Sequence, residues 1–94
     1  MQQFFVYILR CGDGTLYTGW TTDIAARLKA HTEGKGARYT RGRRPLTLVY
    51  QQKTETKQTA MQLEARIKRL KKAEKLALIE TQNKTEKPIH SPFA

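Results

Sequence analysis

The chain has 94 residues, of which 18 are Lys or Arg and 8 are Asp or Glu, so its formal net charge is +10. This length allows one small domain that buries about 60–65% of the surface of its unfolded chain. Cys11 is the single cysteine, which excludes an intramolecular disulfide and a cysteine-based zinc site. The longest apolar run, residues 4–9, is far shorter than the ~20 residues of a membrane span. We find no signal-like N-terminal segment and expect a cytoplasmic protein.

The first half of the chain predicts a hairpin and a helix. Residues 3–9 and 15–20 are rich in aromatic and β-branched side chains and are separated by a Gly-Asp-Gly turn, which is typical of a β-hairpin. Asp23 is expected to cap a helix over residues 24–32 that ends at Gly34. A loop rich in Gly and Arg, residues 34–45, follows, with a short turn around residues 37–40.

The second half predicts a strand and two helices. Residues 46–51 form the third strand, and Thr56 caps a helix through Leu70 whose apolar positions follow the three-four spacing. A short helix over residues 73–81 is expected to pack behind it. The order ββαβαα predicts an α+β domain, a small three-stranded antiparallel sheet flanked by helices, over residues 1–82. Residues 83–94 contain two prolines and few apolar residues, and we expect a flexible C-terminal tail.

The positive charge is concentrated in the last two thirds of the chain. Residues 1–34 balance three basic against three acidic side chains, whereas residues 35–94 hold fifteen basic and five acidic ones. Such clustering is typical of a protein that binds a phosphate backbone, and the alternative is a solvated basic face. The residues expected to bind nucleic acid lie in the loop: Lys35, Arg38, Tyr39, Arg41, Arg43 and Arg44. A second basic cluster comprises Arg66, Lys68, Arg69, Lys71, Lys72 and Lys75.

Five polar side chains occupy positions where they are expected to meet. Tyr7 and Tyr17 lie on the two hairpin strands, and they share one face if the connecting loop has an odd number of residues. Arg27 and His31 stand one turn apart on the first helix, at the border of the core. Glu64 falls within the inward arc of the helix after Thr56, where a carboxylate is costly without a cation, a metal or several donors.

Each of these residues also has a structural interpretation. The two tyrosines could be half-buried strand residues whose hydroxyl groups reach solvent. His31 could complement the dipole at the C-terminal end of its helix. Arg27 and Glu64 could form a structural ion pair. The functional interpretation depends on all five occurring together.

The spacing of these residues resembles the GIY-YIG nuclease superfamily. Val-Tyr-Ile-Leu around Tyr7 and Tyr-Thr-Gly at Tyr17 are similar to its two signature tyrosine motifs, and Arg27, His31 and Glu64 match its later positions over about residues 3–80. The strongest similarity is to small standalone bacterial members, the YhbQ-like proteins. The chain departs from the pattern where some members have a lysine after the second glycine, because this chain has Trp20 there.

The resemblance implies a role for each site residue. It implies that Tyr17 helps to deprotonate the attacking water and that Tyr7 supports the network of phosphate and water. Arg27 would hold the scissile phosphate, His31 would accept or relay a proton, and Glu64 would be the sole protein ligand of one divalent ion. A two-metal site normally draws on several carboxylates. With Glu64 alone, a single hydrated Mg²⁺ or Mn²⁺ is expected.

Together these observations predict a metal-dependent endonuclease. It would be a monomer that hydrolyses phosphodiester bonds in DNA with little sequence preference, in DNA repair or processing, with RNA as a second possible substrate. The alternative is a non-catalytic nucleic-acid-binding module that retains the nuclease fold.

Overall fold

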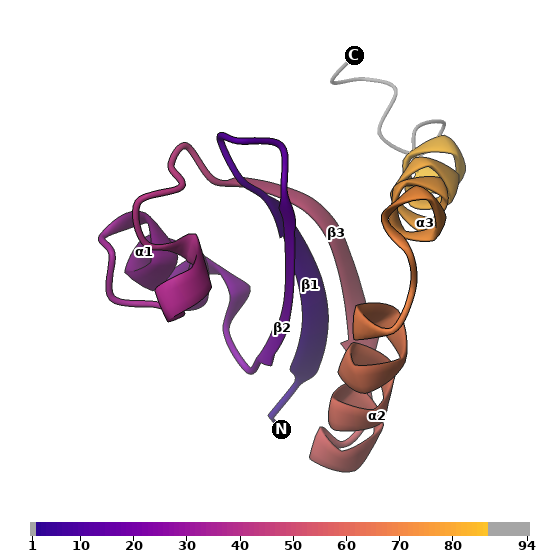
Figure 1. Ribbon diagram of the computed structural model, residues 1–94. Coiled ribbons are helices and arrows are strands. Elements are labelled where there is room, and N and C mark those ends of the chain that lie inside the picture. Colours follow the sequence, from indigo (N-terminus) through magenta and orange to yellow (C-terminus); the bar gives the residue numbers. More distant parts are fainter. Residues whose placement is uncertain (1, 87–94) are drawn as a thin grey trace.

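The computed structural model describes residues 2–86 and contains one antiparallel sheet between two layers of helices. The elements follow in the order β1 (Phe4–Arg10), β2 (Leu16–Thr21), α1 (Ile24–Thr32), the 3-10 turn η1 (Arg38–Thr40), β3 (Thr47–Thr54), α2 (Lys57–Lys68) and α3 (Lys72–Glu86). β1 is the central strand, in the order β2-β1-β3. Figure 1 shows α1 and the segment around η1 on one side of the sheet and α2 and α3 on the other. The predicted α+β class and ββαβαα order are confirmed.

Side-chain caps fix where the first two helices begin. The carboxylate of Asp23 accepts a hydrogen bond of 3.0 Å from the backbone N–H of Ala26, so α1 starts at the predicted residue. Thr56 and Thr59 bond to each other's backbone N–H groups in a capping box at the start of α2. α2 ends at Lys68, two residues before the predicted end. In the residues that the structure describes, no helix is long and apolar enough to span a membrane.

Strand β3 is longer than its apolar pattern predicts. The predicted strand ended at residue 51, and the side chains of residues 52–54 are polar. Backbone pairing with β1 nevertheless continues to Thr54, which lies opposite Phe4. The strand is irregular between Leu48 and Tyr50, which pair with consecutive residues of β1, so Val49 is an extra residue in the ladder.

Helix α3 extends four residues into the segment that was expected to be a tail. It ends at Glu86 rather than near residue 81. The side-chain amide of Gln82 donates to the backbone carbonyl of Gln51 at 2.6 Å and accepts from the N–H of the same residue at 3.2 Å. This contact joins the last turns of α3 to β3, and helix propensity alone does not predict it. The rest of the expected tail, residues 87–94, lies outside the described residues.

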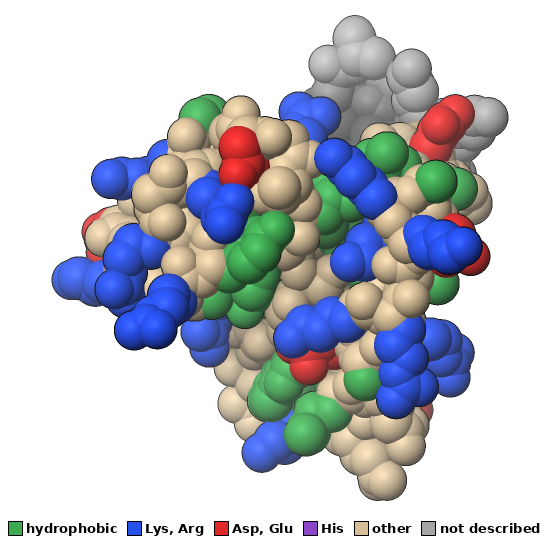
Figure 2. Space-filling view, in the orientation of Figure 1, with side chains coloured by type: hydrophobic (Ala, Val, Ile, Leu, Met, Phe, Trp, Pro, Cys, Tyr) green, Lys and Arg blue, Asp and Glu red, His purple; other side chains and the backbone are tan. Residues whose placement is uncertain are grey.

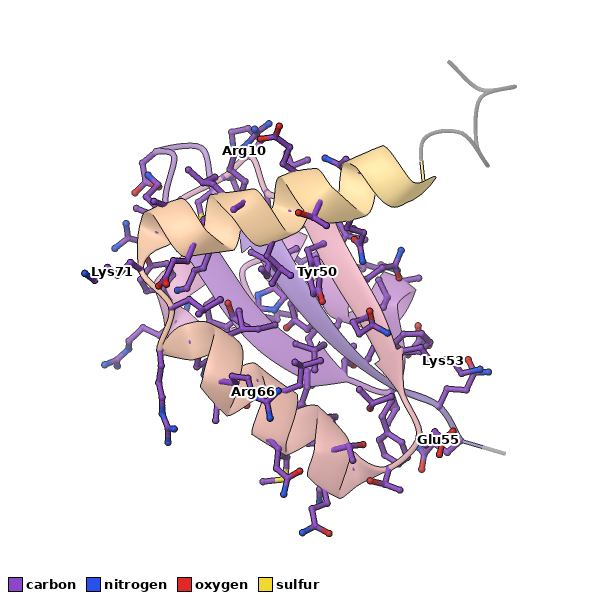
Figure 3. The ribbon with its side chains drawn as sticks, turned by 90° about the vertical axis from the view of Figure 1, so that its right-hand side faces the viewer. Arg10, Tyr50, Lys53, Glu55, Arg66 and Lys71 are labelled. Carbon is purple, nitrogen blue, oxygen red and sulfur yellow. The ribbon has the colours of Figure 1, made fainter. Side chains whose placement is uncertain are left out.

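The apolar core lies between the sheet and the helices α2 and α3. Its buried members are Val6, Ile8, Tyr50, Ala60, Ile67 and Ile79. Figure 3 views the molecule from this side and shows Tyr50 on the sheet, between α2 and α3. Because side chains alternate along a strand, Val6 and Ile8 face these helices while Tyr7 points to the opposite side, toward α1.

Candidate active site

The strand register places the two signature tyrosines on the same face of the sheet. Tyr7 pairs with Gly19 and Leu9 pairs with Tyr17, so the paired residue numbers have an even sum. The connecting loop, residues 11–15, has an odd number of residues. The rings of Tyr7 and Tyr17 have centroids 6.4 Å apart. The predicted arrangement of the hairpin is therefore confirmed.

Gly19 leaves the space that the Tyr7 hydroxyl occupies. A Cβ atom at position 19 would lie 2.6 Å from Tyr7 Oη and 3.2 Å from the ring of Tyr17. Any larger residue would displace both rings. The glycine of the Tyr-Thr-Gly motif thus makes room on the edge strand β2 for the phenol of Tyr7 from the central strand.

His31 is buried beneath the two tyrosines and joins α1 to the sheet. Its side chain is 1% exposed, and its Nε2 lies 2.9 Å from Tyr7 Oη. Its ring makes edge contacts with both tyrosines, at centroid distances of 5.9 Å to Tyr7 and 5.3 Å to Tyr17. The ring points into the protein rather than along the helix axis toward solvent. A simple complement to the helix dipole therefore does not account for this residue.

Electrostatics keep both members of the Tyr7–His31 pair neutral. Burial, followed by the neighbouring Tyr17 and Glu64, raises the pKa of Tyr7 well above its usual range, while Arg27 acts in the opposite direction. Burial, and then the charge of Arg27, lower the pKa of His31. An uncharged imidazole can accept a proton, and a neutral phenol can give one.

Arg27 and Glu64 influence Tyr7 through their charge rather than through a direct contact. Arg27 is exposed on α1, and Glu64 is half-buried on α2, the helix that covers the other face of the sheet. The described ion pair of Glu64 joins it to Lys68 at 3.4 Å, so the suggested Arg27–Glu64 ion pair is not formed. The convergence of all five residues on one cleft stays a prediction.

Tyr39 lies in the basic loop, residues 34–45, and covers Tyr17. Their rings are stacked at 5.8 Å, and the Arg43 guanidinium lies 4.4 Å from the centroid of the Tyr39 ring. Arg43 in turn forms an ion pair of 2.5 Å with Asp13 in the hairpin loop. Hydrogen bonds from the hydroxyl and the backbone N–H of Thr15, together with Arg43, lower the pKa of Asp13 to about 2. These contacts fasten the basic loop over the hairpin.

The basic loop contains two kinds of arginine. Arg43 donates to the carbonyl of Tyr39, and Arg44 donates to the carbonyl of Thr32, so both are engaged within the protein. None of the described contacts involves the side chains of Lys35, Arg38 or Arg41, which are exposed. Figure 2 shows Lys and Arg side chains on both the α1 side and the α2–α3 side of the molecule.

Trp20, at the position where some family members have lysine, faces away from the tyrosines. It packs against Phe4 at a centroid distance of 6.4 Å and borders the core under α2. Its neighbour Thr18, on the same face, is 3% exposed, and its hydroxyl has no partner among the described residues. The motif residues of β2 therefore alternate between the two faces of the sheet.

The donor set for a metal ion is small. Among residues 2–86, no group of three His, Cys, Asp or Glu side chains is placed to hold a metal. Glu64, with a side chain 21% exposed, is the carboxylate whose charge acts on Tyr7. One partly exposed carboxylate fits an ion that keeps most of its water ligands, and it does not fit a two-metal site.

The sequence of this domain matches a known catalytic domain. Residues 3–77 match the family model of the GIY-YIG catalytic domain, so the chain belongs to this family. The similar curated proteins are small bacterial members of the UPF0213 group. One from Streptococcus sanguinis is 54% identical over 81 residues, covering 84% of this chain and 93% of the relative. The protein OB0043 of Oceanobacillus iheyensis is also 54% identical, covering 86% and 94%.

Two solved structures have the same fold. The solution NMR structure of the UPF0213 protein BH0048 from Bacillus halodurans is 46% identical, covers 84% of each chain and has a TM-score of 0.56. The solution NMR structure of EF2693 from E. faecalis is 36% identical, covers 87% of this chain and 88% of that chain, and has a TM-score of 0.60. The names of these relatives state no activity.

Proposed function

We propose that the protein is a divalent-metal-dependent endonuclease that hydrolyses phosphodiester bonds in DNA with little sequence preference. The observation that supports it most strongly is the buried hydrogen bond of 2.9 Å between Tyr7 Oη and His31 Nε2. Tyr17 lies beside this pair, and the charges of Arg27 and Glu64 act on Tyr7. A hydrolase of this kind needs a proton acceptor, a cation for the phosphate and a route for the proton. The site has candidates for all three.

The Tyr7–His31 pair can act as the base. Tyr7 Oη takes a proton from the attacking water while its own proton passes to His31 Nε2. The water oxygen bonds to phosphorus, the bond to the leaving oxygen breaks, and that oxygen takes a proton from solvent. The resemblance gave the role of base to Tyr17, whereas the hydrogen bond to His31 favours Tyr7.

Charged side chains supply the remaining functions. The Arg27 guanidinium neutralises the phosphate oxygens as negative charge accumulates on them. GIY-YIG nucleases generally use a divalent metal. Glu64 would hold a hydrated Mg²⁺ or Mn²⁺ here, and the ion would stabilise charge on the phosphate and the leaving oxygen. Lys68, its ion-pair partner, would then be displaced from the carboxylate.

The test is cleavage of single-stranded, duplex and branched DNA, and of RNA, by the full chain with Mg²⁺, Mn²⁺ or EDTA. Glu64→Gln should lower the rate by orders of magnitude, and excess Mg²⁺ should not restore it fully. Glu55→Gln is the matched control, because it makes the same chemical change at an exposed position on the turn between β3 and α2 (Figure 3). Equal rates for the wild type and Glu64→Gln would assign the activity to another site or to a contaminant.

The second candidate function is nucleic-acid binding without cleavage, and the unpaired basic side chains of the loop favour it. Replacing Lys35, Arg38 and Arg41 by alanine should weaken binding across sequences and lower the log–log salt slope by up to ~0.9 per lost phosphate contact. Glu64→Gln should leave binding nearly unchanged. DNA binding with this behaviour, without cleavage under any metal condition, would establish the binding module. An unchanged salt slope would make these residues a solvated face.

A further inference from the structure

The segment before and through η1 closes around the imidazole of His31. A Cβ atom on Gly36 would lie 2.3 Å from His31 Nδ1, so any side chain at that position would displace the ring. Thr40, which is 1% exposed, places its hydroxyl oxygen 2.8 Å from the same nitrogen. Both ring nitrogens are therefore occupied: Nε2 by Tyr7 from the sheet, and Nδ1 by Thr40 from the loop.

The directions of these hydrogen bonds follow from the single proton of the Thr40 hydroxyl. That proton is donated to the carbonyl of Ala37 at 2.9 Å. Thr40 Oγ1 can then only accept from His31, so the ring carries its proton on Nδ1. The backbone N–H of Ala37 also points at Nδ1 and would donate to it if Nδ1 were unprotonated, but at 3.4 Å this hydrogen bond is longer and weaker than the 2.8 Å contact with Thr40. In a neutral ring, Nε2 is then an acceptor.

We propose that Thr40 is a positioning residue of the active site, because its hydroxyl holds His31 in the Nδ1–H tautomer. Nε2 then carries no proton and can accept the proton of Tyr7. The inference rests on the proposed nuclease function and adds a residue to it that the sequence motifs do not include. When the proton moves from Tyr7 to Nε2, the imidazolium that forms still donates through Nδ1–H to Thr40. Both N–H groups of the imidazolium then have acceptors without rotation of the ring.

Burial makes the choice of tautomer consequential. With the proton on Nε2 instead, the ring would donate toward Tyr7, and two donors would face each other unless the Tyr7 hydroxyl turned away. Tyr7 would then have no acceptor for its proton. In a serine protease, replacement of the group that orients the histidine costs about 10⁴-fold through the wrong tautomer. Mutating the groups that orient metal-ligating histidines typically costs about 10–100-fold, and we expect a loss of this size for a hydroxyl that only accepts a hydrogen bond.

The tautomer can be measured without any cleavage reaction. The chain has two histidines, so His90→Gln gives a background in which His31 alone contributes to the spectrum. In ¹⁵N-labelled protein near pH 8, long-range proton–nitrogen spectra should show Nδ1 protonated and Nε2 unprotonated. Thr40→Val, of similar shape but without the hydroxyl, should lose this preference, whereas Thr40→Ser should keep it. An Nε2–H ring in the wild type, or an unchanged ring in Thr40→Val, overturns the proposal.

Kinetics separate positioning from a structural role. Thr40→Val should lower kcat by about 10–100-fold with little change in KM, and Thr40→Ser should restore most of the rate. Thermal unfolding of each variant verifies that it is folded, and Thr40→Ala replaces Thr40→Val if the latter is not. If a Thr40 variant loses the preference for the Nδ1–H tautomer of His31 but keeps the wild-type kcat, the positioning role of Thr40 in catalysis is overturned. If the wild type cuts no substrate, the nuclease proposal fails, and the ring spectra still decide what Thr40 does to His31.

Discussion

The two faces of the central sheet are held in different ways. The α2–α3 face is closed by apolar side chains, among them Val6, Ile8 and Ile67. The α1 face is closed by a hydrogen-bonded histidine between Tyr7 and Thr40. The apolar face gains free energy from burial alone, whereas the polar face requires every donor to find its acceptor. We infer that the apolar side chains of the first face mainly stabilise the fold, although α2 also carries Glu64, and that the second face fixes the positions of the groups that transfer the proton.

The largest difference between the faces should be seen in activity. Tyr7→Phe removes the hydroxyl that is bonded to His31 and should reduce cleavage by about 10²–10⁴-fold, the range of general acid–base catalysis. Tyr17→Phe should have a smaller effect, because no described hydrogen bond links its hydroxyl to His31. Single-turnover rates of the two variants make the comparison. A larger loss for Tyr17→Phe would return the role of base to Tyr17.

The next effect should be on stability and should arise on the apolar face. Ile67 is 2% exposed in the core, so Ile67→Ala should lower the free energy of unfolding by about 2–5 kcal/mol. The fraction of molecules that remain folded should cut DNA at the wild-type rate. Urea unfolding measures the change, and Leu76→Ala at a position 46% exposed is the control. If the folded Ile67→Ala protein is inactive, the two faces are not separate in function.

A smaller effect should follow from the buried imidazole. The pKa of His31 is lowered in the folded protein, so the unfolded chain binds more protons as the pH falls below about 6.5. The stabilisation from keeping this ring neutral is therefore present above that pH and is lost below it. Urea unfolding at pH 7.5 and pH 5.0 tests the sign. His31→Gln, which cannot titrate, should lose less stability between the two pH values than the wild type does.

The smallest effect concerns a side-chain oxygen on the apolar face that is buried without a partner among the described residues. Thr18 lies opposite Ile8, and its hydroxyl finds no partner among residues 2–86. Thr18→Val keeps the shape and removes that atom, so it should raise the free energy of unfolding by about 1 kcal/mol. The cleavage rate should not change. A destabilised variant would mean that water or another group satisfies this hydroxyl in solution.

Much of this arrangement could be predicted from local sequence patterns. The caps at Asp23 and Thr56, the hairpin and the shared face of the tyrosines depend on neighbouring residues and on strand alternation. The contacts of His31 with Thr40 could not be predicted, because they depend on how an aperiodic loop folds back on the helix. Full burial of His31 was missed for the same reason, since helix periodicity placed it only at the border of the core.

The long-range side-chain contacts also lie beyond sequence patterns. Arg43 was expected to bind nucleic acid, yet its pairing with Asp13, thirty residues away, engages it within the protein. The charge of Arg43 was visible in the sequence, but its partner was not. The exposed Arg38 and Arg41 therefore become the better candidates in this loop for contact with a phosphate backbone.

The amide pair between Gln82 and Gln51 has a consequence for self-association. β3 forms one edge of the sheet, and the free N–H and C=O groups of an edge strand are a template for pairing with a strand of another molecule. Gln82 occupies both backbone groups of Gln51 near the middle of that edge. α3 thus blocks an intermolecular β-sheet at this position with one side chain. A chain shortened before Gln82 would expose the edge and tend to aggregate through it.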